Sequence, residues 1–497
     1  MRTTVLETRP HERAQQPRHA VPFMARSLLA LALSAALVPG AHAEKPIEWQ
    51  EPGLQLRSRL SFETEFLRNR QLAARDIRTK TEITPEARLA GRWQFDRRWG
   101  IAGELELEDA TERETGRNTN HDTVLKVKQL YGEAQLQEYG ARLRLGRVSR
   151  TDDRGWFFDT EFDGVEGTLE QGPWQVTAFY ARVGQWNRDL LSSHEKRSDG
   201  TDYLAALGTY RLSDTHQLLL KALHQNNDRT DQRLTHVAAG SQNMPKKGMQ
   251  HWAMVSLVSG HEGGRSVLGE AIDLGATWFL DEQSEWAPRA TLGYAWGSGD
   301  DGNGKDNAHR QSGLQNNKAK LGNIMDFEVY GVALDPQLSN LHVLTAGVGF
   351  APMEKSTLDL VFHHYRQDKV GALGSDRSNL RPRGDQLNKR ALGNGIDIVW
   401  GWRPTKQWRV EVAGGVFCHL ADSARATRPM PTRHATSTPA AWKSSTTRTG
   451  RSEPAPAPSG PTMGMQVPGQ AGWPRFGTPK EGGPAHPRGP ARDLSMT

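Results

Sequence analysis

Basic residues recur in pairs that are separated by one position, a spacing that places both side chains on the same face of a β-strand. The pairs are Arg57 with Arg59, Lys126 with Lys128, and Arg142 with Arg144. A guanidinium can bind a carboxylate through two parallel hydrogen bonds, and a row of cations concentrates anions near it. The chemistry that these residues offer is therefore the binding of anionic groups.

Acidic residues follow the same spacing on a nearby segment. Glu104, Glu106 and Glu108 alternate with Leu105 and Leu107. Carboxylates on one strand can neutralise arginines on the next. The basic pairs are therefore either anion-binding residues or structural partners of these glutamates, and the sequence leaves both interpretations open.

Strands are the elements that would position these pairs, because polar and apolar residues alternate along most of the chain. In 54–62, Leu54, Leu56, Leu60 and Phe62 share one parity, and Arg57 and Arg59 have the other. A period of two predicts a strand with one apolar face. Since the stretches follow a secretion signal and most can cross a bilayer when tilted, we predict an all-β fold, a transmembrane antiparallel β-barrel. Its apolar faces would meet lipid, and its polar faces would line the lumen.

Seventeen stretches are readable as strands. They are 54–66, 81–95, 99–109, 123–137, 140–149, 164–171, 173–183, 201–212, 216–225, 249–259, 270–280, 287–297, 323–333, 341–350, 356–367, 394–402 and 407–417. The alternation within 123–137 changes phase near Leu130. Long polar segments such as 226–248, 298–322 and 368–393 predict long extracellular loops, and short ones such as 171–173 predict periplasmic turns. Because bacterial single-chain barrels have even strand numbers, we expect that one strand is lost.

The N-terminal segment has the layout of a secretory signal. Residues 28–38 are an apolar run after Arg26, and Ala41-His-Ala43 resembles a cleavage site. Residues 1–43 are therefore predicted to be a signal peptide, with translation starting at Met1 or at Met24, and the mature chain is expected in the Gram-negative outer membrane. The single cysteine, Cys418, excludes an intrachain disulfide.

The barrel is predicted to span 44–417, because the pattern changes after Phe417. Residues 418–497 hold thirteen of the 27 prolines, a composition that favours a disordered tail or a shifted reading frame, with the final strand missing. Residues 44–416 hold 48 basic and 51 acidic side chains, a net charge of −3. The formal charge of +6 therefore does not support binding to a nucleic acid.

Two motifs are more specific than the alternation. The first comprises Leu145-Gly-Arg-Val-Ser-Arg150, Asp152-Asp-Arg-Gly-Trp-Phe-Phe-Asp159 and Phe162-Asp-Gly-Val165. The second comprises Gly297-Ser-Gly-Asp-Asp301 and Arg310-Gln-Ser-Gly-Leu-Gln-Asn-Asn317. Across about 54–417 the chain resembles the alginate-export family of outer-membrane barrels. The resemblance implies an eighteen-stranded monomeric barrel with an electropositive constriction, which passes a polyuronate outward without energy input and works with a periplasmic scaffold.

Carried onto this sequence, the resemblance implies a set of pore-lining cations. They are Arg147, Arg150, Arg310, Lys318, Lys320 and Arg366, beside the inward arginines Arg57, Arg59, Arg142 and Arg144. Asp159 and Asp163 would either orient these arginines or cap turns. We expect no catalytic residue, cofactor or metal ligand.

Other functions have weaker support. Gly297-Ser-Gly-Asp-Asp-Gly302 fits a dinucleotide-binding pattern, but no helix is expected after it. The sequence 301–306 lacks several ligands of a calcium loop. A porin for small organic anions is the alternative within the transport class, and an outer-membrane hydrolase or acyltransferase would depend on His194, Ser198 and Asp199.

Overall fold

The structure is a computed structural model that describes residues 50–69, 72, 78–152, 154–183, 189–191, 200–245, 247–281, 283–321, 325–373, 387–419 and 440–451, the side chains of 320–321 and 440–451 excepted. Almost every regular element in these ranges is a β-strand. The strands are β1 (Gly53–Arg68), β2 (Thr79–Gln94), β3 (Trp99–Glu114), β4 (Asn120–Leu136), β5 (Ala141–Thr151), β6 (Asp159–Gln171), β7 (Trp174–Arg182), β8 (Thr201–Arg211), β9 (His216–Asn227), β10 (Gln232–Asn243), β11 (Met249–Glu262), β12 (Arg265–Phe279), β13 (Arg289–Gly297), β14 (Lys318–Leu321), β15 (Met325–Glu328), β16 (Leu341–Phe350), β17 (Ser356–Arg366), β18 (Ala391–Trp402), β19 (Trp408–His419) and β20 (Ala440–Arg451). A single 3-10 turn, η2 (Gln137–Tyr139), joins β4 to β5. The described part of the chain contains no helix with the length and apolar character needed to span a membrane.

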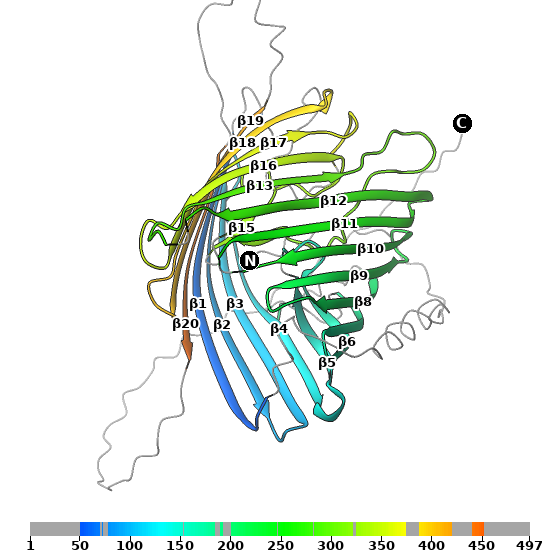
Figure 1. The fold of residues 1–497 in the computed structure, drawn as a ribbon, viewed down its shortest axis with the longest axis vertical. Coiled ribbons are helices and arrows are strands. Elements are labelled where there is room, and N and C mark those ends of the chain that lie inside the picture. The colour runs from blue at the N-terminus through cyan, green and yellow to red at the C-terminus, as the bar shows by residue number, and fades with distance from the viewer. Residues whose placement is uncertain are drawn as a thin grey trace, which may run out of the picture. The chain divides into compact units, whose positions relative to one another are not determined.

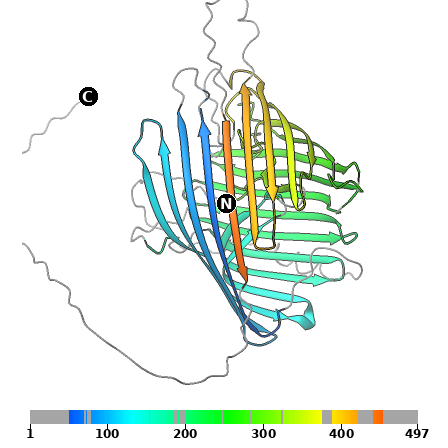
Figure 2. The ribbon, with the colours of Figure 1, turned by 90° about the vertical axis from the view of Figure 1, so that its left-hand side faces the viewer.

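Eighteen of the strands form one closed antiparallel sheet (Figure 1). Each strand pairs with its neighbours in chain order, and β20 pairs with both β19 and β1. Figure 2 shows β20 in orange between the blue β1 and the yellow-orange β19. Closure leaves no unpaired sheet edge, which is the condition for crossing a bilayer with strands. The prediction of an antiparallel β-barrel of about eighteen strands is confirmed.

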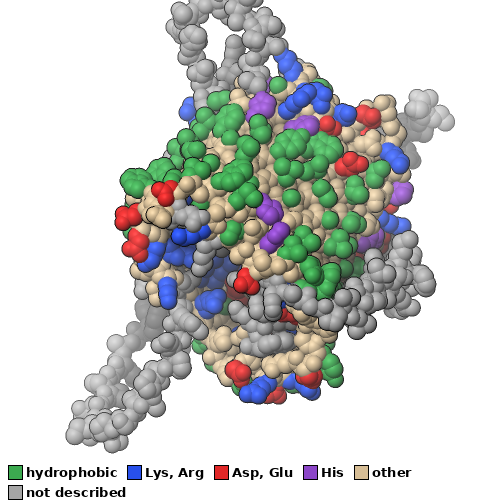
Figure 3. All heavy atoms as spheres, viewed as in Figure 1, with side chains coloured by type: hydrophobic (Ala, Val, Ile, Leu, Met, Phe, Trp, Pro, Cys, Tyr) green, Lys and Arg blue, Asp and Glu red, His purple; other side chains and the backbone are tan. Residues whose placement is uncertain are grey.

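The faces of the strands follow the predicted parity. Leu54, Leu56, Leu60 and Phe62 are between 46% and 64% exposed on the outside of β1. The outer surface is covered with hydrophobic side chains over large areas (Figure 3). Polar residues of the opposite parity point inward, because successive side chains on a strand alternate.

The strand list differs from the prediction at four places, one of which is β14 within the predicted loop 298–322. β10 lies within 226–248, which we expected to be a loop; its Thr235, Ala238 and Gly240 blur the contrast between the two faces. The predicted strand 323–333 forms only β15, outside the main sheet. The eighteenth strand, β20, lies in the segment that we expected to follow the barrel. The predicted signal peptide lies outside the described residues.

The two ends of the barrel have different connections. At one end, called the short-turn end, the connections are brief, such as 95–98, 172–173 and 212–215. At the other, called the long-loop end, they include 69–78, 183–200, 298–340 and 367–390. In barrels of this class the short turns are periplasmic and the long loops extracellular.

The connection 298–340, called the plug, folds into the barrel and packs against one wall. Its β14 and β15 form a hairpin, and Phe327 of β15 stacks on His363 of β17, with 6.3 Å between ring centroids. Tyr365 donates a hydrogen bond to the Tyr330 carbonyl (2.8 Å), and the Val332 amide donates to Asp397 (3.0 Å). This explains the apolar character of 323–333: these residues face the protein interior and not lipid.

Candidate functional site

The wall opposite the plug is formed by β1 to β5 and is densely charged. Near the short-turn end its inward charged side chains are mostly arginines, called the basic zone: Arg57, Arg59, Arg92, Arg142 and Arg144. Lys and Arg side chains are visible inside a recess of the surface (Figure 3). On β1 and β5 the apolar residues that alternate with these arginines are exposed on the outside. This agrees with the sequence-based prediction that the inward residues include Arg57, Arg59, Arg142 and Arg144.

Glu133 of β4 neutralises part of the basic zone. It is 3% exposed, forms an ion pair with Arg92, and accepts a hydrogen bond from Arg144 (2.8 Å). The Arg144 guanidinium also lies 3.6 Å from Glu166 and stacks over the Tyr131 ring at 4.9 Å. Arg144 is therefore held rigidly, as expected of a structural partner.

Arg57 and Arg142 differ from Arg144. Within the described ranges neither side chain forms a hydrogen bond or an ion pair; Arg57 is exposed to the lumen and Arg142 is half-buried. An arginine without an acidic partner keeps its donors available for a passing anion. Arg144 therefore fits the interpretation as a structural partner of glutamates. Arg57 and Arg142 fit the interpretation as anion-binding residues.

The middle of the wall is a lattice of alternating charges. Arg88 of β2 forms ion pairs with Glu86 and Glu106, each at 2.5 Å, and Lys126 of β4 lies 2.6 Å from Glu108. The register is interrupted between Glu104 and Leu105 of β3, where β4 contributes one extra residue, Lys128. This bulge is the change of phase expected near Leu130. Since cations and carboxylates alternate, the lattice is close to neutral.

Arg150 lines a recess beside the plug. It donates to Glu166 (2.7 Å), which makes it a paired residue. The recess has a cavity volume of about 100 Å³ and is also lined by Arg154, Lys221 and Trp252. Arg154 lies 4.3 Å above the Trp252 ring and 3.2 Å from Asp273. Sequence reasoning missed Arg154 and Lys221, because the strands that meet here are distant in the chain.

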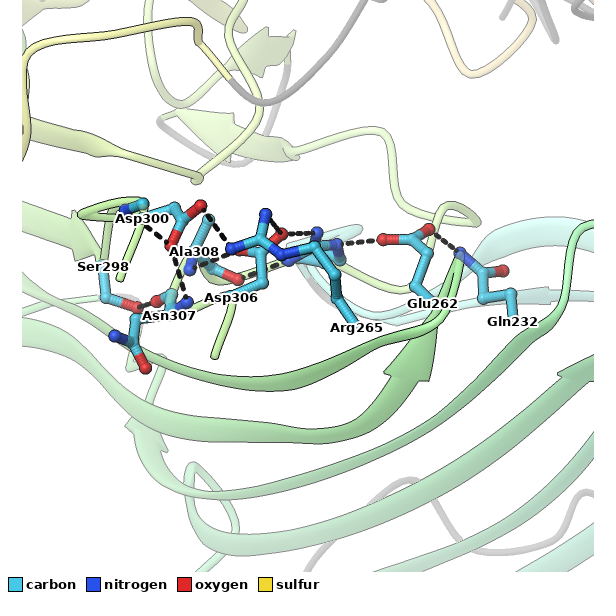
Figure 4. Close-up of polar contacts among 10 residues, drawn as sticks. Gln232, Glu262, Arg265, Ser298, Asp300, Asp306, Asn307 and Ala308 are labelled. Atoms are coloured by element: carbon cyan, nitrogen blue, oxygen red, sulfur yellow. Dashed lines mark hydrogen bonds and ion pairs between the residues drawn. The ribbon is translucent and has the colours of Figure 1, made fainter. Parts of the chain in front are cut away.

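Arg310 fastens the plug to the rim of the barrel. Its guanidinium binds Glu262 of β11 (2.5 Å), Asp306 (2.6 Å) and the Ala308 carbonyl (2.9 Å). Figure 4 shows the network continuing to Gln232 on one side and to Arg265 and Asp300 on the other. Burial by itself would raise the pKa of Asp306, but hydrogen bonds from Arg310 and the Ala308 amide lower it overall. Arg310 is thus an anchor of the loop, and its donors are occupied.

The rest of the second motif braces the plug against the connection between β5 and β6. Gln311 donates to the Trp156 carbonyl (3.2 Å) and Ser312 to the Phe157 carbonyl (2.5 Å). Asn316 donates to Asp159 (2.5 Å), which also accepts from Thr151 (2.6 Å). Asp159 therefore fixes the plug and contacts no arginine among the described residues. The two sequence motifs therefore lie side by side in the fold, because residues of the second motif bind residues of the first.

Two predicted pore-lining arginines face outward. Arg147 shares the parity of the exposed Leu143 and Leu145, and it is 4% exposed. It binds Asp163 through two hydrogen bonds (2.6 and 2.7 Å) and donates to the Val127 carbonyl (3.0 Å), which β5 leaves unpaired. Asp163 therefore orients an arginine, but outside the lumen. These two residues close a gap between β4 and β5.

Arg366 shares the parity of the exposed Leu360 and Phe362, whereas His363 and Tyr365 point inward. Its predicted place in the pore is wrong, and the parity of Phe362 was a signal that could have shown this. Lys318 lies 3.2 Å from Glu328 on the plug hairpin, and the side chain of Lys320 lies outside the described residues.

No group of three potential metal-ligating side chains is found among the residues that the structure describes. His194, Ser198 and Asp199 lie outside the described residues.

A closed barrel with an apolar exterior and a charged lumen defines the class: an outer-membrane β-barrel channel. The model of the family described as alginate export matches residues 48–426. The chain therefore belongs to the alginate export family. A comparison with curated proteins finds no relative.

Solved structures with a similar fold include outer-membrane proteins of two organisms. OpdQ of Pseudomonas aeruginosa matches with 11% identity over 80% of this chain and 99% of its own, with a TM-score of 0.49. OccAB3 of Acinetobacter baumannii matches with 11% identity over 80% and 99%, TM-score 0.49. OccK2 (OpdF) of Pseudomonas aeruginosa, solved in complex with glucuronate, matches with 12% identity over 81% and 100%, TM-score 0.47. At TM-scores below 0.5 these likenesses carry no conclusion about this chain.

Proposed function

We propose that this channel passively exports an anionic polysaccharide, an alginate-like polyuronate, from the periplasm. The single observation that carries the proposal is the pair Arg57 and Arg142 in the basic zone near the short-turn end, where a polymer from the periplasm would enter. Membership of the alginate export family supports the same substrate class.

The neighbouring paired arginines have a different role in this proposal. Arg92 and Arg144 are held by Glu133, so they keep the wall positive without changing position. Arg57 and Arg142 would contact uronate carboxylates one at a time, each contact weak enough to break as the chain slides. The plug would narrow the lumen so that the polymer stays near the charged wall.

Planar-bilayer recording tests this function. Polymannuronate added at the short-turn end is expected to block the single-channel current, and neutral dextran of similar length is expected not to. Changing Arg57→Gln together with Arg142→Gln should weaken the polymannuronate block about tenfold or more, since two charge-assisted contacts of roughly 1 kcal/mol each are lost. Equal block by dextran and polymannuronate would overturn the proposal.

A matched control distinguishes a specific role of Arg57 and Arg142 from a general effect of positive charge at this end of the barrel. Arg97 and Arg403 are exposed residues on short-turn connections outside the strands. Arg97→Gln with Arg403→Gln removes the same charge from the same end of the barrel and should leave the block within about twofold. If the control weakens the block as much as the lumen variant does, the two lumen arginines have no special role.

A porin for small organic anions is the second candidate, and the recess beside the plug favours it. Arg154 over the Trp252 ring, with Lys221 on the same recess, offers a cation and an aromatic face to a single sugar acid. Galacturonate that blocks the current as strongly as the polymer at equal carboxylate concentration would favour this candidate.

The remaining features of the export model are proposals of the same kind. A signal peptide at 1–43 would direct the chain to the outer membrane, the barrel would act as a monomer, and a periplasmic scaffold would deliver the polymer. Detergent-solubilised protein should therefore elute at the mass of one chain, and its N-terminus should begin after Ala43.

A further inference from the structure

The inner wall changes sign along the pore. Near the long-loop end, the inward charged side chains of β1 and β3 are all carboxylates, here called the acidic zone: Glu63, Glu65, Glu108, Glu112 and Glu114. The same two strands carry Arg57 and Arg59 near the short-turn end. The lattice around Arg88 separates the two zones.

Several basic partners of the acidic zone are shared between carboxylates or lie outside the strands. Lys80 of β2 lies 2.7 Å from Glu112 and 3.0 Å from Glu82, so one lysine serves two carboxylates. Glu114 lies 2.9 Å from Arg117, which belongs to the β3–β4 connection and is largely exposed. Lys126, the partner of Glu108, also serves Glu106 at 3.6 Å. Within the described strands β1 to β3, the inward carboxylates near this end, which are Glu63, Glu65, Glu82, Glu108, Glu112 and Glu114, outnumber the single inward cation, Lys80.

The basic zone has the opposite balance. Glu133 is the carboxylate that Arg92 and Arg144 share, and Arg57 and Arg142 add two cations that no described carboxylate binds. Register also places Arg451 of β20 opposite Arg57, and Lys443 opposite Glu65. The closing strand therefore places a basic residue opposite one member of each zone.

We propose that this wall makes the channel an ionic rectifier, with an anion-attracting mouth at the short-turn end and a cation-attracting mouth at the long-loop end. Each mouth concentrates ions of the opposite charge. When the long-loop side is positive, cations enter through the acidic zone and anions through the basic zone, so both accumulate and conductance rises. When the voltage is reversed, each mouth repels the ions that must enter it, and conductance falls.

The direction of rectification matches export of an anion. Anions move easily from the short-turn end to the long-loop end, and the carboxylates at the exit repel an anion that would enter from outside. The acidic zone would therefore slow re-entry of the polymer, but as a fixed barrier it adds no driving force for export. This consequence rests on the proposed function, but the rectification itself concerns only small ions.

The test is the current of single channels in about 0.1 M KCl, where charges act over about 10 Å. An epitope inserted in the 228–231 connection marks the long-loop end, and block by its antibody reports the orientation of each channel. The expected current at +100 mV on the long-loop side is about 1.5-fold or more above that at −100 mV. In about 1 M KCl, where charges act over about 3 Å, the ratio should approach one.

Variants test whether the acidic zone causes the rectification. Glu108→Gln, Glu112→Gln and Glu114→Gln together should bring the ratio close to one and make the channel more anion-selective. A control with three exposed acids of the short-turn end, Glu51→Gln, Glu138→Gln and Glu354→Gln, should preserve the ratio. Heat-dependent migration on gels confirms that both variants are folded barrels.

Each outcome decides one claim. A wild-type ratio near one, rectification of the opposite sign, or loss of rectification in the control alone would overturn the inference. Rectification without block by polymannuronate would uphold the inference and contradict the proposed function. Block by polymannuronate without rectification would uphold the proposed function and contradict the inference.

Discussion

Acidification should loosen the plug through His309. This side chain is 1% exposed, and its Nδ1 lies 2.8 Å from the Leu338 carbonyl. Since Nδ1 must donate to that carbonyl, Nε2 carries no proton in the neutral ring, and it has no partner in the described structure. Burial lowers the pKa of His309 to about 4, against the raising effect of the Leu338 hydrogen bond, and the charge of Arg310 lowers it further. The docked plug therefore holds His309 neutral.

The sign and size of the effect follow from linkage. When the plug is undocked, the pKa of His309 returns to its usual 6.5, so the undocked state binds more protons below that pH. The stability of docking is complete above pH 6.5 and declines as the pH falls toward 4. At pH 5 the loss is about 2 kcal/mol, or roughly a thirtyfold change in the docking equilibrium.

Single-channel dwell times measure this equilibrium. The fraction of time in a higher-conductance state with the plug undocked should rise by about thirtyfold between pH 7.5 and pH 5. His309→Gln keeps a donor for the Leu338 carbonyl and removes the titration, so the variant should respond much less to pH. An equally strong pH response in this variant would refute the reasoning.

Three further predictions concern stability. Arg144→Gln should lower the free energy of unfolding in urea by about 1.5 to 3 kcal/mol, because Glu133 and Glu166 each lose one of two cationic partners, whereas Arg142→Gln should lower it by less than about 1 kcal/mol; similar values for both would contradict the distinction between them. Asp397→Ala should cost about 1 to 3 kcal/mol, because the Val332 amide loses its acceptor, and proteolysis within the plug should accelerate in proportion; unchanged proteolysis would show that this contact does not hold the plug. Truncation after residue 439 should abolish the heat-dependent gel shift of a closed barrel, whereas truncation after residue 452 should preserve it, because only the first removes β20; a gel shift in the shorter chain would show that β1 and β19 close the barrel without β20.

The predicted shift of reading frame near Cys418 has a genetic test. The family match ends at residue 426, before β20 begins at Ala440. DNA sequencing around the codon for Cys418 should reveal an alternative frame that encodes an alternating strand with a terminal aromatic residue. A single open frame through this region would reject the frameshift.

The barrel and the faces of its strands could be predicted from the sequence because alternation is a local property. Successive side chains of a strand point to opposite sides, so Leu54 and Arg57 reveal their faces without reference to any other strand. The same rule, applied to Leu145 and Phe362, would have placed Arg147 and Arg366 outside the lumen. Those two errors came from assigning family roles to residues before the parity of the strand was considered.

Only the tertiary structure decided which charged side chains have partners and where the plug packs. Arg142 and Arg144 look equivalent in sequence, yet the register of β4 and β5 brings Glu133 opposite Arg144 and Gln135 opposite Arg142. The plug packs on β17, β18 and β19, which follow it in the chain. Pairing between strands and the docking of a loop depend on residues far apart in the chain, so a local pattern contains the direction of a side chain but not the identity of its partner.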